Sequence, residues 1–220
     1  IPQEESVVVK IVDKHNLDIR NFRLLVNYKL DDPRLSRKAN NFDQYLTANA
    51  GSKYKIQTII GYEPSLDTNI IKSLNITDDD VLMGNQYNLS ESNIDIINRY
   101  SIKYIITDTV SLTPLFDKLR LTYHLTKTDN DMYLYNLNNT PPILSSASER
   151  TKIDFNGESF FIENLPPGKS TLSYNYSELS LHLKLYADNE NVILSSENGV
   201  LTLNNNSNFP VNVNVNFSQL

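Results

Sequence analysis

The most informative segment of the chain is residues 96–107, Ile-Ile-Asn-Arg-Tyr-Ser-Ile-Lys-Tyr-Ile-Ile-Thr. Its second half, residues 102–107, is a short apolar run rich in β-branched side chains, which is typical of a strand buried on both faces. Residues 90–100 begin with a serine in a capping pattern and then carry apolar side chains at helical spacing. We therefore predict a helix over residues 90–100 that leads directly into a buried strand over residues 102–107.

Upstream of this segment, strand and helix patterns alternate. A first helix is predicted to begin near Val7, although the β-branched run at residues 7–9 also fits a strand. Strands are predicted at residues 22–28 and 55–60, and helices at residues 34–47 and 65–74. Alternation of this kind predicts parallel strand pairing with right-handed crossover connections.

Downstream, residues 119–125 and 132–135 alternate as strands around a polar turn, which predicts an antiparallel hairpin at the edge of the sheet. Pro141-Pro142 and the serine-rich residues after them indicate a linker. We therefore predict that residues 1–145 form an α/β domain with a Rossmann-like, mixed and mostly parallel sheet.

The pattern changes after about residue 148. Several segments alternate strictly between apolar and polar side chains, and Asn-Gly pairs at residues 156–157 and 198–199 are turn signals. Seven short strands are expected, at residues 152–155, 159–163, 170–176, 180–186, 192–194, 200–203 and 211–217. This spacing predicts an all-β sandwich domain over residues 146–220.

Composition excludes several classes of function. The 220 residues carry a formal net charge of −6, which gives no electrostatic footprint for nucleic acid. No cysteine is present, so thiolate catalysis, thiolate metal sites and disulfides are excluded. No apolar run is long enough to span a bilayer. Because the chain begins at Ile1 without a signal-peptide pattern, we expect it to be a piece of a longer protein.

Motifs for catalysis, cofactors and metals are also missing. The three histidines, His15, His124 and His182, do not have metal-ligand spacing, and no Gly-x-Ser-x-Gly element is present. Neither Gly-x-Gly-x-x-Gly nor a phosphate-binding loop occurs among the 6 glycines. We therefore expect no cofactor, no metal and no catalytic residue in this chain.

One local cluster is a candidate binding site. Gly61, Tyr62 and Glu63 follow a predicted strand, and Asp108 follows another. In open α/β sheets, ligands bind beyond the carboxyl ends of the strands, so these four residues could meet there. A purely structural alternative also fits, in which the glycine forms a tight turn before a helix. The 13 tyrosines add a second possibility, which is contact with a sugar by exposed rings.

Several blocks, in order, resemble the extracytoplasmic region that follows the membrane helices of YfhO-like membrane proteins. These proteins are similar to class C glycosyltransferases, which use lipid-linked sugar donors. The blocks are Phe-Arg-Leu-Leu-Val (22–26), Ile-Ile-Gly-Tyr-Glu-Pro-Ser-Leu (59–66), the segment 96–107, Met-Tyr-Leu-Tyr-Asn-Leu-Asn (132–138) followed by Pro141-Pro142, and Gly-Lys-Ser-Thr-Leu-Ser-Tyr (168–174). Glu63 replaces the usual Asn or Asp of the second block.

The resemblance implies a non-catalytic domain at the extracytoplasmic face of the cell membrane, which serves as a scaffold or recognises an acceptor or sugar. The family's catalytic acids lie between membrane helices, so none of them corresponds to a residue here. The implied partners are the protein's own membrane-spanning region and a glycan or lipid-linked sugar. Two alternatives remain: a secreted or surface-attached adhesion protein without membrane helices, and an enzyme that uses Gly61, Glu63 and Asp108.

Overall fold

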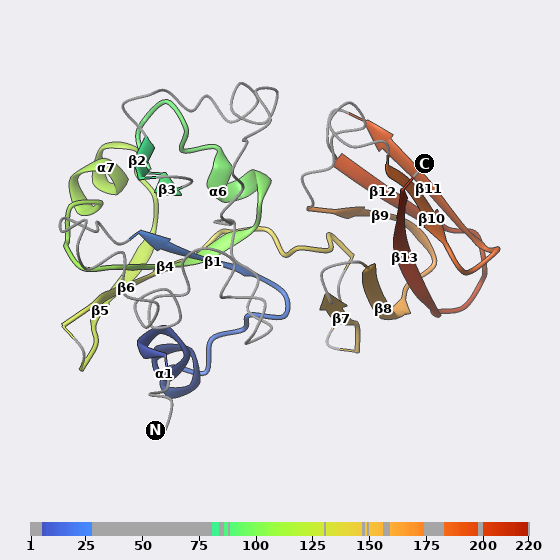
Figure 1. Cartoon of the computed structure of the whole chain (residues 1–220), viewed down its shortest axis with the longest axis horizontal. Helices are drawn as coiled ribbons and strands as arrows, with labels where there is room; N and C mark the ends of the chain where they lie inside the picture. Colours follow the sequence, from blue (N-terminus) through green and yellow to red (C-terminus); the bar gives the residue numbers. More distant parts are fainter. Residues whose placement is uncertain are drawn as a thin grey trace.

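The chain forms two units joined by a linker (Figure 1). The computed structural model describes residues 6–27, 81–83, 86–87, 89–129, 131–146, 148, 150–155, 159–173, 183–197 and 200–219. The elements predicted at residues 34–47, 55–60 and 65–74 lie outside the described residues. No helix in the described part of the chain is both long and apolar enough to cross a membrane.

The first unit, here called the mixed-sheet unit, is built on four strands in the order β1-β4-β6-β5. They are β1 (Arg23–Asn27), β4 (Ile102–Thr107), β5 (Tyr123–Lys127) and β6 (Tyr133–Leu137). A separate pair, β2 (Val81–Met83) and β3 (Gln86–Tyr87), forms a short antiparallel hairpin. The helices among the described residues of this unit are α1 (Val7–Lys14), α6 (Ile96–Arg99) and α7 (Thr113–Lys118).

The prediction of a Rossmann-like α/β fold is wrong for the part of the chain that the structure describes, because this part is mainly β-structure. Thirteen strands stand beside three short helices in the described residues. Only the β1–β4 pair of the four-stranded sheet is parallel, whereas β4–β6 and β5–β6 are antiparallel. The cause is the 123–137 hairpin, whose second strand lies directly beside β4 and so makes two of the three strand pairs antiparallel.

The four-stranded sheet is covered on both faces. Side chains of α1 pack on one face against alternate strand residues, among them Leu24, Val26 and Ile106. Side chains of α6 and α7 pack on the other face with Leu25, Ile105 and others. Because side chains alternate along a strand, the continuous apolar run of β4 supplies both cores. Its burial agrees with the sequence prediction for residues 102–107.

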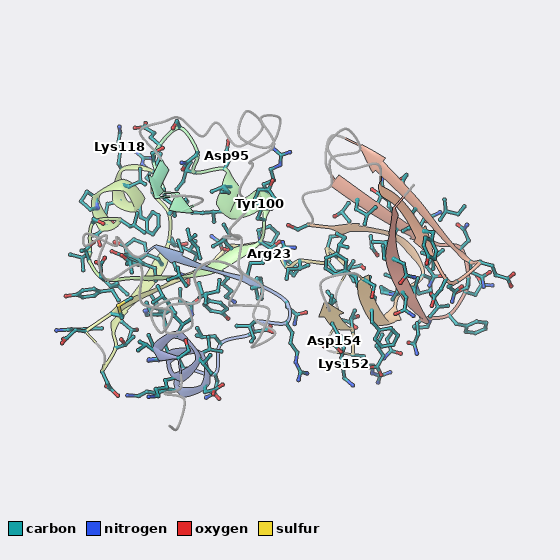
Figure 2. All side chains as sticks on the ribbon, viewed as in Figure 1. Arg23, Asp95, Tyr100, Lys118, Lys152 and Asp154 are labelled. Carbon is teal, nitrogen blue, oxygen red and sulfur yellow. The ribbon has the colours of Figure 1, made fainter. Side chains whose placement is uncertain are left out.

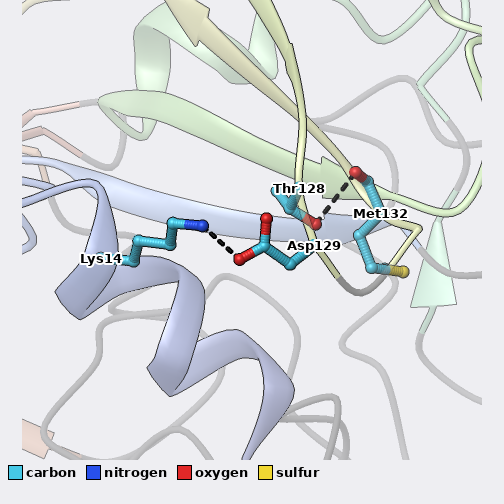
Figure 3. Close-up of polar contacts among 4 residues, drawn as sticks. All are labelled: Lys14, Thr128, Asp129 and Met132. Carbon is cyan, nitrogen blue, oxygen red and sulfur yellow. Dashed lines mark hydrogen bonds and ion pairs between the residues drawn. The ribbon is translucent and has the colours of Figure 1, made fainter.

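The end of α1 is tied to the turn between β5 and β6 (Figure 3). Lys14 in the last turn of the helix forms an ion pair with Asp129. Within the turn, the backbone N–H of Thr128 and its Oγ1 atom donate to the carbonyl oxygen of Met132, at 2.7 and 3.0 Å. Thr128 is buried, so both of its polar groups are satisfied where water is excluded.

The helix predicted over residues 90–100 is shorter in the structure, since α6 begins only at Ile96. The cause is Asn93, a buried residue whose Oδ1 accepts the backbone N–H of Ser90 at 2.9 Å. Its carbonyl oxygen accepts from Ile96 N in an i to i−3 bond, which makes a tighter turn than an α-helix. Asparagine side chains compete with helical backbone bonds in this way. The sequence prediction also missed α7, which carries a proline in its first turn.

The second unit, here called the two-sheet unit, contains the remaining seven strands. They are β7 (Lys152–Phe155), β8 (Ser159–Leu165), β9 (Gly168–Leu172), β10 (Leu183–Ala187), β11 (Val192–Glu197), β12 (Val200–Asn205) and β13 (Val211–Gln219). Their sheets have the orders β10-β13-β8-β7 and β11-β12-β9. Each of the seven strands predicted between residues 152 and 217 overlaps one of these elements.

The two sheets of this unit share one core. Phe160, Ile162 and Val215 from the four-stranded sheet lie in the same buried cluster as Leu172 and Leu203 from the three-stranded sheet. Residues of the linker join the core as well. Ile143 and Leu144 are fully buried in it, and Leu144 forms a β-bridge with Leu172.

Candidate functional site

The first candidate region is the carboxyl end of the parallel strand pair. Asn27, the last residue of β1, is in register with Thr107, the last residue of β4, so the two strand ends meet. Asp108 follows at this end and is partly buried. The Oγ1 atom of Thr107 accepts the backbone N–H of Thr109 at 3.3 Å, which fixes the turn after the strand.

The other three residues predicted for this site, Gly61, Tyr62 and Glu63, lie outside the described residues. In the described part of the chain, no group of three or more His, Cys, Asp or Glu side chains could hold a metal ion. The proposed binding site at these four residues stays a prediction.

A cluster of aromatic rings lies where α7 packs on the four-stranded sheet. The ring of Phe116 packs edge-on against those of Tyr123 and Tyr135, at centroid distances of 5.5 and 5.3 Å. The hydroxyl of fully buried Tyr135 is 2.9 Å from Oγ1 of Thr113, and the hydroxyl of Tyr123 donates to Asp117 at 2.9 Å. Burial raises the pKa of Tyr135 above its usual value. The role of the cluster is packing.

The second candidate region is the junction between the two units. Arg23, at the start of β1, is 6% exposed, and its Nη1 atom donates to the carbonyl oxygen of Tyr100 at 2.8 Å and to Oγ of Ser173 at 3.2 Å. The same hydroxyl donates to the carbonyl oxygen of Arg99 at 2.6 Å. Figure 2 labels Arg23 and Tyr100 on the side of the mixed-sheet unit that faces the two-sheet unit.

Main-chain bonds complete this junction. The N–H of Ser173 donates to the carbonyl oxygen of Ile143, and the N–H of Ile143 donates to the carbonyl oxygen of Asn21, both at 2.7 Å. The linker is thus bonded on one side to the segment before β1 and on the other to the end of β9. These bonds, together with a buried guanidinium that is satisfied across the boundary, hold the units in one defined arrangement.

The third candidate region is the outer face of the four-stranded sheet in the two-sheet unit. Along β8 the buried residues Phe160 and Ile162 alternate with Phe161, which is 36% exposed. On β10, Tyr186 is 51% exposed. Phe161 lies opposite Asn214 of β13, and Tyr186 lies opposite Asn216. Each outward ring therefore has an asparagine beside it on β13, the strand between β10 and β8.

Charged groups complete this surface. Asp154 of β7 is exposed and lies opposite Phe161 on the other side of β8. Nearby, Lys152 forms an ion pair with Glu163, with 3.1 Å between Nζ and Oε2. Figure 2 labels Lys152 and Asp154 at the lower edge of the two-sheet unit. We call the surface made by Asp154, Phe161, Tyr186, Asn214 and Asn216 the aromatic–asparagine face.

A fourth feature is the loop between β12 and β13, which presents Phe209 with 73% of its surface exposed. The loop is fixed by Asn205, which is 2% exposed. Its Nδ2 atom donates to the carbonyl oxygens of Leu165 and Phe209, both at 3.0 Å, and its Oδ1 atom accepts the N–H of Ser207 at 3.0 Å. The buried asparagine gives this polar loop one conformation.

Neither the junction nor the aromatic–asparagine face was predicted from the sequence, although the sequence has an unusual feature at each of them. Arg23 is a charged residue at the start of an apolar strand segment, and its interaction with a residue 150 positions away has no local signal. Phe160 and Phe161 are adjacent in a predicted strand, so one of the two rings has to point away from the core. That signal alone could have located the outer face.

When the chain is compared with family models, with curated proteins and with solved structures, none of the three comparisons finds a match. The features that bear on function are therefore the geometry of the junction and that of the aromatic–asparagine face.

Proposed function

We propose that the chain is the extracytoplasmic part of a polytopic membrane protein of the YfhO-like, class C glycosyltransferase-like kind. In that protein it is a scaffold that holds a recognition surface at a fixed place near the membrane-embedded reaction centre. The partners of the chain are then its own membrane-spanning region and a glycan or lipid-linked sugar. The chemistry itself belongs to the membrane part.

The observation that carries this proposal is the convergence of separate sequence blocks at one junction. Arg23 belongs to the block 22–26, Arg99 and Tyr100 belong to the block 96–107, and Ser173 belongs to the block 168–174. These residues are bonded to one another in the structure. Blocks that are far apart in sequence thus form one structural feature, which supports the resemblance that they carry.

The same blocks also form a contiguous part of the sheet. The block 22–26 covers all of β1 except its last residue, and the blocks 96–107 and 132–138 contain β4 and β6. These three are neighbouring strands in that order. Buried neighbouring strands have to preserve their side-chain pattern together, because each packs against the others. A scaffold function fits this arrangement, since the two cores and the junction make a firm support for the two-sheet unit.

The experiment uses the full-length gene product in its native membrane. The chain has no cysteine, so Glu190→Cys, at an exposed position after β10, introduces a unique label site within it. We expect a membrane-impermeant maleimide to label this variant in intact cells and the protein to stay in the membrane after an alkaline carbonate wash. The unsubstituted protein is the control for labelling elsewhere.

Two results would contradict the proposal. Labelling only after lysis would place the domain on the cytoplasmic side. Labelling in intact cells combined with release by the wash would favour the alternative of a secreted or surface-attached adhesion protein.

A further inference from the structure

We propose that the aromatic–asparagine face binds a neutral oligosaccharide, which lies across β13 and stacks on Phe161 and Tyr186. This inference rests on the proposed function and deepens it, because it names the surface and the chemical class of the ligand.

The first argument is the exposure of two aromatic rings on one face of a sheet. Phe161 and Tyr186 both lie outside the core that the same strands bury. Removal of such apolar surface from water by a bound ligand is favourable. Two rings on strands that flank the same central strand therefore offer a ligand a large apolar contact at positions that the backbone holds rigidly.

The second argument is the placement of amide groups between the rings. Asn214 and Asn216 both come from β13, and each lies in register with one ring. Asn214 is held in place by Asp188, which accepts its backbone N–H at 2.7 Å and its Nδ2 at 2.6 Å. An asparagine amide both donates and accepts hydrogen bonds. The hydroxyl groups of a sugar have the same dual character. The C–H faces of the sugar rings, in contrast, can pack on aromatic side chains.

The spacing of the rings indicates the size of the ligand. Phe161 and Tyr186 are separated by one strand and by one step of two residues along it. From the usual strand spacing and rise, their Cα atoms are about 12 Å apart. That distance exceeds one sugar ring, so a single monosaccharide cannot stack on both side chains. An oligosaccharide can do so.

The charge of the surface indicates a neutral ligand. Lys152 is paired with Glu163. Among the side chains described on this face, this pairing leaves the exposed carboxylates of Asp154 and Asp188 as the net charge. A carboxylate repels phosphate, sulfate and uronate groups but accepts hydrogen bonds from hydroxyls. The described face therefore fits an uncharged glycan better than an anionic one.

The experiment titrates the full chain with neutral oligosaccharides of glucose, mannose, galactose and N-acetylglucosamine, together with their monosaccharides and sulfated dextran. Calorimetry and tyrosine fluorescence are the measurements. We expect saturable binding of at least one neutral oligosaccharide and no measurable binding of its monosaccharide. Tyr186→Ala and Phe161→Ala should each raise Kd about tenfold, a change equivalent to about 1.4 kcal/mol.

The matched control is Phe209→Ala, which removes an even more exposed ring from the loop at the end of the same unit. It should leave Kd unchanged. Circular dichroism should show that each variant is folded, because all three substitutions are at exposed side chains.

Four outcomes would overturn the inference. They are no saturable binding of any neutral probe at millimolar concentration, binding that survives both ring substitutions, a preference for sulfated dextran, and self-association that Phe161→Ala abolishes. None of these bears on the labelling experiment in intact cells. The proposed membrane location and the proposed glycan site can therefore fail separately.

Discussion

The guanidinium of Arg23 donates a hydrogen bond to the hydroxyl of Ser173 across the boundary between the two units, at 3.2 Å. Arg23 is nearly buried, so its charge depends on such partners for compensation. The hydroxyl accepts this bond and donates another to the main chain beside α6. One serine thus couples the first strand of the mixed-sheet unit, the end of its helix α6 and the last residues of β9.

Removal of either partner should therefore cost stability, and the two costs should not add. We expect Arg23→Met to lower the free energy of unfolding by about 2–3 kcal/mol, because it removes charge-assisted bonds from a buried position. Ser173→Ala should cost about 1–2 kcal/mol. Urea unfolding of both variants and of the double variant measures the coupling, which should be at least about 0.5 kcal/mol. Strict additivity would show that the two side chains do not act together.

The stability of the loop that carries Phe209 should depend on the side chain of Asn205. Asn205→Ala leaves the carbonyl oxygens of Leu165 and Phe209 without their amide donor, so we expect a loss of about 2–3 kcal/mol in thermal or urea unfolding. Asn206→Ala is the control, because Asn206 is exposed. It should change stability by no more than about 0.5 kcal/mol. Equal effects of the two variants would contradict the structural role of the buried amide.

Local patterns in the sequence located the strands better than they located the partners of the strands. The apolar run at residues 102–107 and the alternating segment 152–155 coincide with β4 and β7. Apolar side chains at every second position indicate which residues of a strand are buried. They do not indicate which strand pairs with it or whether the pairing is parallel. The Rossmann-like prediction failed at that step, because β6 returns antiparallel beside β4.

The prediction of a helix over residues 90–100 placed its start wrongly for a local reason, whereas the prediction missed the junction for a non-local reason. The apolar spacing there fits a helix, yet Asn93 bonds its side chain back to Ser90 and delays the helix until Ile96. Arg23 and Ser173 belong to different units and are 150 residues apart in the sequence. A single sequence carries no sign of that contact, since neither residue belongs to a recognisable motif.

Adjacent phenylalanines on β8 give a direct test of which face is buried. Phe160 is 1% exposed in the shared core, and Phe161 points outward. Phe160→Ala should destabilise the protein by about 3–5 kcal/mol, because it leaves a cavity in the core. Phe161→Ala should cost less than about 1 kcal/mol. Chemical denaturation of the two variants measures both values, and a reversed order would mean that the register of β8 is shifted by one residue.

Alkaline titration should reveal the buried tyrosines of the mixed-sheet unit. Burial is the main cause that raises the pKa of Tyr100, Tyr104 and Tyr135 above the usual 10.0. The folded state therefore holds these protons more tightly than the unfolded state. Their contribution to stability is complete below about pH 10 and is lost as the pH rises through the folded-state values.

Ultraviolet absorbance of tyrosinate should accordingly show a late phase in the native protein, and this phase should disappear in guanidinium chloride. Tyr135→Phe should remove part of the late phase and should cost about 1 kcal/mol, because Thr113 loses the partner of its hydroxyl. Stability measured by urea unfolding should fall steeply in the same alkaline range. A native titration curve identical to that of the unfolded chain would contradict the burial of these three phenols.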